Sequence, residues 1–252
     1  MFSPRDGLAD MPVELPCGKC TGCRADQALM WSIRAYHEST LHEQNSFITL
    51  TYDDDHLPED GLIDKKHLQD FFKRLRRDLP PGTVRYIACG EYGEQTRRPH
   101  YHAILFGLDF LHDKITINED LYTSPTLESI WGQGNVSIAP VTMASICYVC
   151  GYVMKKIDDA DTFNLMSRRP GIGSTWLSLY KDDLKRTGSV TIEGREYPVP
   201  KRYLDWEQEE FEQLKRQRLK YARSGDALQK RGDLRNREKN RNAKLKGRKE
   251  KI

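Results

Sequence analysis

Two histidines separated by one residue, His100 and His102, have the spacing of a metal-binding pair. Residues two apart in a β-strand project from the same face, so a strand through this run holds both imidazoles side by side. A His-x-His pair alone is more often incidental. A preceding strand carries Glu91, and a hairpin that pairs Glu91 with His100, and Cys89 with His102, adds a carboxylate to the histidine face. This mixed nitrogen and oxygen set predicts a Mg²⁺ or Mn²⁺ site that acts as a Lewis acid on phosphate.

Two tyrosines could supply a nucleophile. Tyr148 and Tyr152 are four residues apart in a predicted helix over residues 143–157, so their hydroxyls lie one turn apart on one face. Lys155 returns nearly to that face and Lys156 lies somewhat off it, and either could stabilise a phosphate or lower the pKa of a phenol. The alternative is an amphipathic helix with two half-buried tyrosines. Cys147 and Cys150 point away from the tyrosines, and we expect both to face the core.

Three cysteines near the start, Cys17, Cys20 and Cys23, follow a C-x-x-C-x-x-C pattern. In a reducing cytoplasm this spacing suggests metal binding or a tight turn rather than disulfides. A structural Zn²⁺ normally takes four ligands. The fourth would have to come from Cys89, Cys147, Cys150 or a histidine such as His37, and buried structural thiols are the alternative.

The elements that must position these residues follow the order β, α, β, β, α after an N-terminal helix. Asp64 is suited to cap a helix with apolar residues at helical spacing, and Pro80 ends it. We predict helices over about 21–43, 64–79 and 143–157, and strands over 47–52, 84–91, 100–107 and 136–138. This order predicts an α+β fold, an antiparallel sheet with helices packed on one face. Beyond Lys181 the sequence is polar, with short Gly turns.

The charge of the chain is unevenly distributed. Residues 213–252 hold 16 Lys and Arg against 4 Asp and Glu, so the net charge of +3 conceals a tail of +12 and a body of −9. Such a tail is either a solvated helix or a segment that binds a polyanion. No apolar run reaches the roughly 20 residues that span a membrane, and no signal-peptide core is present, so we expect a cytoplasmic protein. We divide the chain into 1–45, a cysteine-rich helical arm; 46–180, the core; and 181–252, an extension with a basic helical or disordered tail.

Three ordered motifs resemble those of HUH endonucleases, the rolling-circle replication initiators: Phe47–Tyr52, His100-Tyr101-His102, and Tyr148-x-x-x-Tyr152 followed by lysine. The resemblance implies a split βαβ core like that of an RRM domain, with Glu91, His100 and His102 as metal ligands. It also implies a tyrosine that nicks single-stranded origin DNA, keeps the 5′ end as a phosphotyrosine and later rejoins the strand. Which tyrosine acts first stays open. We expect DNA contacts from four arginines: Arg97, Arg98, Arg168 and Arg169.

More narrowly, four segments resemble the initiators of Microviridae phages of the gokushovirus group: residues 16–24, 90–93, 98–102 and 167–173. The resemblance implies a phage protein in a bacterial cytoplasm that acts on single-stranded and supercoiled origin DNA with the host replication machinery. No Gly-x-x-x-x-Gly-Lys-Ser/Thr motif occurs, so we expect no nucleotide binding and a host helicase as partner.

Two other functions compete with this interpretation. A zinc-stabilised, non-catalytic binder of single-stranded DNA or RNA would explain the cysteines and the tail, but it gives no reason for two histidines, a carboxylate and paired tyrosines to coexist. A relaxase or transposase of the same chemical superfamily would differ in biology more than in mechanism.

Overall fold

The computed structural model describes the chain from Cys17 to Ala222, except residues 78, 94, 156–162 and 210, and adds only residues 239 and 243. For residues 152–155, 218, 219, 221 and 222 it describes the backbone alone. Most of the predicted basic tail therefore lies outside the described residues.

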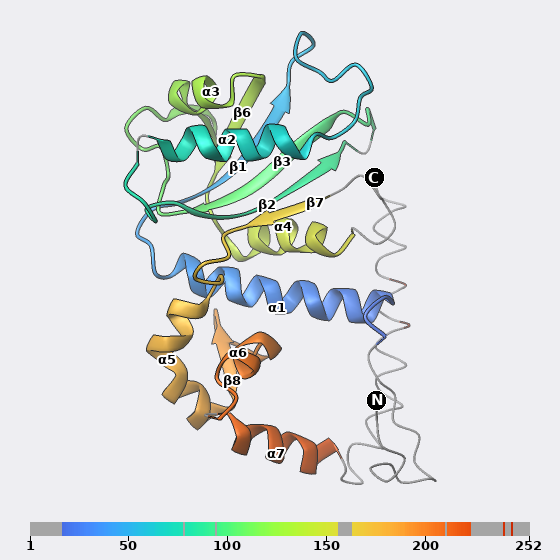
Figure 1. The fold of residues 1–252 in the computed structure, drawn as a ribbon, viewed down its shortest axis with the longest axis vertical. Coiled ribbons are helices and arrows are strands. Elements are labelled where there is room, and N and C mark those ends of the chain that lie inside the picture. Colours follow the sequence, from blue (N-terminus) through green and yellow to red (C-terminus); the bar gives the residue numbers. More distant parts are fainter. Residues whose placement is uncertain are drawn as a thin grey trace.

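A seven-stranded sheet forms the centre of the molecule (Figure 1). Its strand order is β4-β5-β6-β1-β3-β2-β7, and each pair of neighbours is antiparallel. The strands are β1 (Asn45–Tyr52), β2 (Arg85–Tyr92), β3 (Pro99–Phe106), β4 (Ile115–Asn118), β5 (Leu121–Thr123), β6 (Gly134–Ala139) and β7 (Phe163–Met166). The four predicted strands are confirmed within two residues at each end, whereas β4, β5 and β7 were not predicted.

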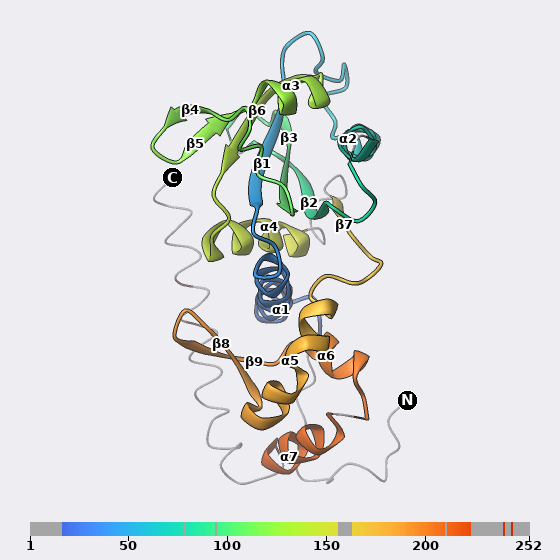
Figure 2. The same ribbon diagram turned by 90° about the vertical axis from the view of Figure 1, so that its left-hand side faces the viewer.

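Helices cover both faces of the sheet rather than one (Figures 1 and 2). One face packs on α2 (Lys65–Arg77) and α3 (Pro125–Trp131), and the other on α4 (Met143–Lys155), behind which lies α1 (Thr21–Ser39). The one-face prediction was wrong because the central strands are apolar on both sides. Leu50, Ala103 and Leu105 face α2, while Ile87 and Ile104 face α4. Asp64 caps α2 as predicted, accepting a 2.7 Å hydrogen bond from the Lys66 amide.

A second hydrophobic cluster lies on the far side of α1 from the sheet (Figure 2). It joins Ile33 of α1 to apolar side chains between Leu177 and Phe211. The elements here are α5 (Ser174–Thr187), the hairpin of β8 (Ser189–Ile192) and β9 (Arg195–Pro198), α6 (Lys201–Trp206) and α7 (Glu212–Ala222). The division of the chain at residues 45 and 180 stays a prediction. Within the described residues, no helix is long and apolar enough to cross a membrane.

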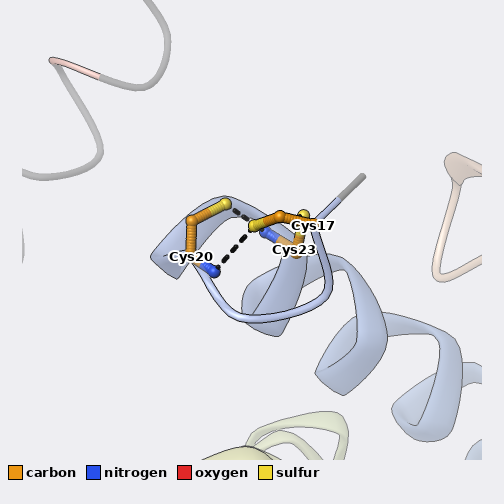
Figure 3. Close-up of side chains that lie close together, drawn as sticks. All are labelled: Cys17, Cys20 and Cys23. Atoms are coloured by element: carbon orange, nitrogen blue, oxygen red, sulfur yellow. Dashed lines mark hydrogen bonds between the residues drawn. The ribbon is translucent and has the colours of Figure 1, made fainter. Parts of the chain in front are cut away.

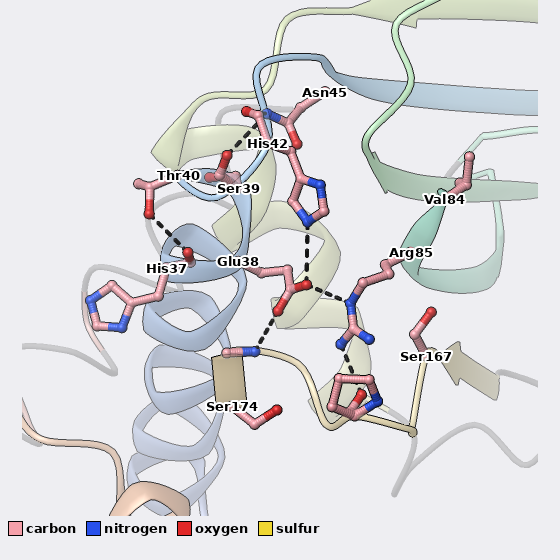
Figure 4. Close-up of polar contacts among 12 residues, drawn as sticks. His37, Glu38, Ser39, Thr40, His42, Asn45, Val84, Arg85, Ser167 and Ser174 are labelled. Atoms are coloured by element: carbon pink, nitrogen blue, oxygen red, sulfur yellow. Dashed lines mark hydrogen bonds and ion pairs between the residues drawn. The ribbon is translucent and has the colours of Figure 1, made fainter. Parts of the chain in front are cut away.

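A buried carboxylate ties these layers together (Figure 4). Glu38, at the end of α1, accepts hydrogen bonds from Arg85 Nε of β2 at 2.5 Å, from the Gly173 amide before α5 at 2.7 Å, and from His42 Nε2 at 3.4 Å. Burial alone would raise the pKa of Glu38, but these hydrogen bonds and the charge of Arg85 outweigh burial and lower it. Glu38 is therefore an ionised anchor between the helix, the sheet and the C-terminal elements.

Candidate active site

The pairing of β2 with β3 brings the predicted metal ligands together. Glu91 lies opposite His100, and Cys89 lies opposite His102, which confirms the predicted register. Cross-strand partners share a face of the sheet, so the carboxylate joins the two imidazoles on the side covered by α4. One ligand atom from each of Glu91, His100 and His102 lies within 4.8 Å of the others, close enough to share one ion.

The carboxylate of Glu91 is bonded on one oxygen only. Its Oε1 accepts hydrogen bonds from His100 Nε2 at 3.1 Å, from the Tyr148 hydroxyl at 2.8 Å, and lies 2.8 Å from His102 Nε2. Its Oε2 is buried and has no hydrogen-bond partner. A buried carboxylate oxygen without a partner is costly. A cation between these groups would remove that cost, so the residues fit a divalent metal ion.

The outer nitrogens of both imidazoles are also held. His100 Nδ1 lies 3.1 Å from the Arg98 carbonyl oxygen, and His102 Nδ1 lies 3.0 Å from Thr49 Oγ1. Both nitrogens of His100 therefore face acceptors, and a neutral imidazole, with one proton, can satisfy only one of them. With Nδ1 donating outward to Arg98, Nε2 needs a proton or a metal ion. Such outer partners fix ring orientation in metal sites.

The ionisation of these groups follows from burial and from Glu91. Burial would raise the pKa of Glu91, but hydrogen bonds from His100, His102 and Tyr148 outweigh it and lower the pKa to about 2. Burial lowers the pKa of His102 more than Glu91 raises it. For His100 the balance is reversed: burial would lower its pKa, but the bonds to Glu91 and the Arg98 carbonyl raise it. At neutral pH the site therefore holds an ionised carboxylate and a neutral His102, both suited to bind a cation.

Tyr148 lies beside this triad. Its side chain is 42% exposed, its hydroxyl bonds Glu91, and its Oη lies 3.5 Å from His102 Nε2. The Phe47 ring packs edge-on against Tyr148 and stacks on His102, which supports both groups. The backbone of Tyr152 and Lys155 lies in α4 as predicted, but their side chains and all of Lys156 lie outside the described residues.

The four predicted DNA-binding arginines do not lie together. Arg97 and Arg98 are in the β2–β3 turn, at the Glu91 end of the sheet. Arg98 is engaged within the protein, because it donates to the Tyr52 carbonyl and to Asp54 Oδ1. Arg168 and Arg169 are exposed beyond β7, where Ser167 bonds Tyr86 at the opposite end of β2. The strand between these ends spans roughly 17 Å at about 3.3 Å per residue.

The three N-terminal cysteines form a separate cluster (Figure 3). Cys20 caps α1, and the sulfur atoms of Cys17 and Cys23 lie 3.9 Å apart. The fourth ligands considered from the sequence are elsewhere: Cys89 and Cys150 are buried in the sheet core, and His37 stacks on Trp176. Cys147 is exposed, not core-facing as predicted. Within the described part of the chain, no fourth protein ligand joins the cluster.

The sequence analysis missed Thr49 and Phe47 as parts of this site. Both lie in the strand motif it singled out, and their alternation places them on one face. The missing information was that β1 pairs with β3, which sets Thr49 opposite His102.

Comparison with known proteins gives the family. A family model described as replication-associated protein ORF2 matches residues 45–157. Replication-associated protein VP4 of Bdellovibrio phage phiMH2K is 35% identical over 214 residues, covering 76% of this chain and 66% of the relative. Replication-associated protein ORF4 of Chlamydia phage 1 is 32% identical, covering 76% and 53%. The chain thus spans about two thirds and about half of these two relatives.

A third relative is covered more fully. Replication-associated protein ORF2 of Spiroplasma virus 4 is 31% identical over 238 residues, which are 83% of this chain and 74% of the relative. No solved structure gives a significant match. With this identity and coverage, the chain belongs to the ORF2 family of phage replication-associated proteins, together with those of these Microviridae-like phages.

Proposed function

We propose that this protein initiates rolling-circle DNA replication by nicking single-stranded origin DNA with a tyrosine. The observation that carries the proposal is the contact of the Tyr148 hydroxyl with Glu91, in a cluster with both histidines. A nucleophile, a metal-binding set and a family of replication-associated proteins meet in one site. The non-catalytic binder considered above would need none of this geometry.

Glu91, His100 and His102 would hold a divalent ion, Mg²⁺ or Mn²⁺, through one carboxylate oxygen and two Nε2 atoms. Bound there, the ion supplies Lewis-acid polarisation of the scissile phosphate. The Arg98 carbonyl and Thr49 keep both rings oriented, so the ligand set is formed before substrate arrives.

Tyr148 supplies the nucleophilic oxygen. The Tyr148 Oη–P bond forms as the bond from phosphorus to the 3′ oxygen breaks; the phenol loses its proton and the 3′ oxygen gains one. The products are a 5′-phosphotyrosine and a free 3′-hydroxyl that can prime synthesis. Attack by that hydroxyl on the phosphotyrosine rejoins the strand, because the transfer conserves the phosphodiester bond energy.

Tyr152, one turn further along α4, would perform the second transfer that ends a round while the first 5′ end is held. Lys155 or Lys156 would assist by contact with phosphate. The chemistry acts on the exposed single strand of supercoiled origin DNA, so we propose that a host helicase and the host replication machinery supply unwinding and synthesis in the bacterial cytoplasm.

We also propose that Cys17, Cys20 and Cys23 hold one structural Zn²⁺. Their sulfur atoms lie within 4.8 Å of one another at the start of α1. Hydrogen bonds from the backbone amides of Cys20 and Lys19 lower the pKa of Cys17 to about 7, which favours the thiolate that binds metal. A fourth ligand would come from water or from residues outside the described part of the chain.

The test of the proposed nickase is direct. The full chain is incubated with end-labelled, origin-like single strands and Mn²⁺, and covalent adducts are separated on a denaturing gel. We expect an adduct that maps to Tyr148 or Tyr152 and that EDTA abolishes. An adduct on Tyr92 or Tyr101 would overturn the nucleophile assignment, and full activity in EDTA would overturn the metal assignment.

A further inference from the structure

A cavity of about 830 Å³ lies between the middle of α1, the segment after β7 and helix α6. This volume is in the range of pockets that enclose small ligands. The walls include two tryptophans, Trp31 and Trp206, and the four cationic side chains Arg34, Arg168, Lys201 and Arg202. Two carboxylates, Asp205 and Glu207, leave a positive balance of two charges. None of these residues belongs to the proposed nicking site.

Arg34 is the unusual member of this wall. Its side chain is only 6% exposed, yet its guanidinium donates one hydrogen bond, from Nε to the Ile172 carbonyl at 3.0 Å. No carboxylate of the described residues forms an ion pair with it, because Glu38, one turn away, is bonded to Arg85. A buried cation without an anionic partner is unfavourable. The Nη groups of Arg34 therefore provide a site for an anion.

Aromatic rings surround this cation. The Arg34 guanidinium lies 4.0 Å from the centre of the Trp31 ring and 4.9 Å from that of Trp206. Arg202 lies over Trp206 at 5.4 Å. Burial, followed by weaker effects that include repulsion from Arg202, lowers the pKa of Arg34 to about 10. Alternating indoles and guanidiniums present flat apolar surfaces and phosphate donors together, the combination with which proteins hold single-stranded nucleic acid.

We propose that this cavity binds one nucleotide of a single DNA strand, with its phosphate on Arg34 and Arg202 and its base against Trp31 and Trp206. A concave pocket favours an unpaired nucleotide, since bases in a duplex are stacked inside. The inference rests on the proposed function, because it assigns part of the substrate strand. Met166 and Ser167 lie at the rim, so the nucleotide held here is several positions from the scissile phosphate.

The test separates binding from cleavage. Fluorescence anisotropy with a labelled 20-nucleotide oligothymidine, in EDTA, measures single-strand affinity when no metal-dependent nicking occurs. The exposed pair is changed in Arg168→Ala/Arg202→Ala, and the matched control is Arg186→Ala/Arg195→Ala, two exposed arginines outside the cavity. We expect the first variant to bind roughly tenfold more weakly with a salt slope about one lower per lost contact, and the control to match the wild type.

Two further variants report on the buried part. Trp206→Phe should weaken binding less than Trp206→Ala, because a smaller ring still stacks. Arg34→Lys keeps the charge and loses the planar fork, so its affinity should fall while its melting temperature stays close to wild type. An oligothymidine carrying a photoreactive base should crosslink to peptides containing Trp31 or Trp206.

Several outcomes would overturn the inference: equal affinity of the Arg168/Arg202 variant and its control, equal losses on single-stranded and duplex DNA, or competition by polyglutamate as effective as by oligothymidine. The failure of the nickase is distinguishable. If no adduct ever forms but the cavity variants lose single-strand affinity, the proposed chemistry is wrong and the nucleotide site stands.

Discussion

The hydroxyl of Tyr148 donates a 2.8 Å hydrogen bond to Oε1 of Glu91, although 57 positions separate the two residues. The bond joins α4 to β2 and aims one phenol at the proposed metal ligands. Tyr152 begins one helical turn away, so the two tyrosines of α4 need not be equivalent in the first cleavage step.

We therefore expect Tyr148→Phe to slow formation of the covalent adduct at least a hundredfold in single turnover, and Tyr152→Phe to slow it less than tenfold. Phenylalanine keeps the ring contact with Phe47 and removes only the nucleophilic oxygen. The double variant should form no adduct. Adduct kinetics on a quenched-flow gel measure this, and a larger loss for Tyr152→Phe would assign the first attack to Tyr152.

The Thr49 hydroxyl should affect metal affinity without touching the metal. Thr49→Val removes the partner of His102 Nδ1, and the loss of such outer contacts typically weakens metal binding about 10- to 100-fold. Thr51→Val is the matched control, since it removes a hydroxyl from the same strand that makes no hydrogen bond among the described residues. Mn²⁺ titration followed by electron paramagnetic resonance measures both, and equal affinities would show that Thr49 does not orient His102.

Zinc content tests the cysteine cluster. The purified full chain should contain about one zinc per molecule, and Cys20→Ser should lose it, whereas Cys147→Ser, a change of another exposed cysteine, should keep it. Replacement by Co²⁺ should produce thiolate-to-cobalt absorption in the near ultraviolet. A zinc-free, fully folded protein that nicks DNA normally would leave Cys20 as a helix cap alone.

The stability of the fold should fall in mild acid because of His37. Burial against Trp176 and Tyr203 lowers the pKa of His37 to about 3, against about 6.5 when the chain is unfolded. The unfolded state therefore binds the proton more readily, so this stability is present above pH 6.5 and is lost as pH falls toward 3. The loss is of the order of 4 kcal/mol when complete.

Urea unfolding between pH 7.5 and 5 measures this loss. The paired variant His37→Phe/Tyr203→Phe removes the titrating ring together with its hydroxyl partner and should flatten the profile. His112→Gln, at an exposed histidine, should retain the wild-type slope. An unchanged slope in the His37 variant would transfer the effect to another group.

Truncation after Ala222 tests the basic tail. Residues 223–252 carry 12 Lys and Arg against 4 Asp and Glu, while α7 remains to pack Leu214 on the second cluster. We expect weaker DNA binding and a smaller salt slope, because fewer counterions are released, with the cleavage position unchanged. Equal slopes for the truncated and full chains would show that the tail does not bind DNA.

The sequence predicted the local features of this fold better than its global arrangement. The β2–β3 register followed from alternation and a short turn, so Glu91, His100 and His102 were assembled correctly. The elements after Lys181 appeared polar because their apolar residues are widely spaced. Val190, Tyr203 and Phe211 acquire a core only when they meet α1. Likewise, Arg34 is an ordinary helical arginine until the segment near Ile172 encloses it.

Helix α1 carries Ile33 in one hydrophobic cluster and Ala35, two positions later, in another. It is thus a shared wall with no outward-facing apolar side of its own. Removing everything after β7 would strip one side of this wall and leave an oily stripe in water. In evolutionary terms, the C-terminal elements could not have been added to an otherwise finished α1; the helix and the segments on either side of it had to be shaped together.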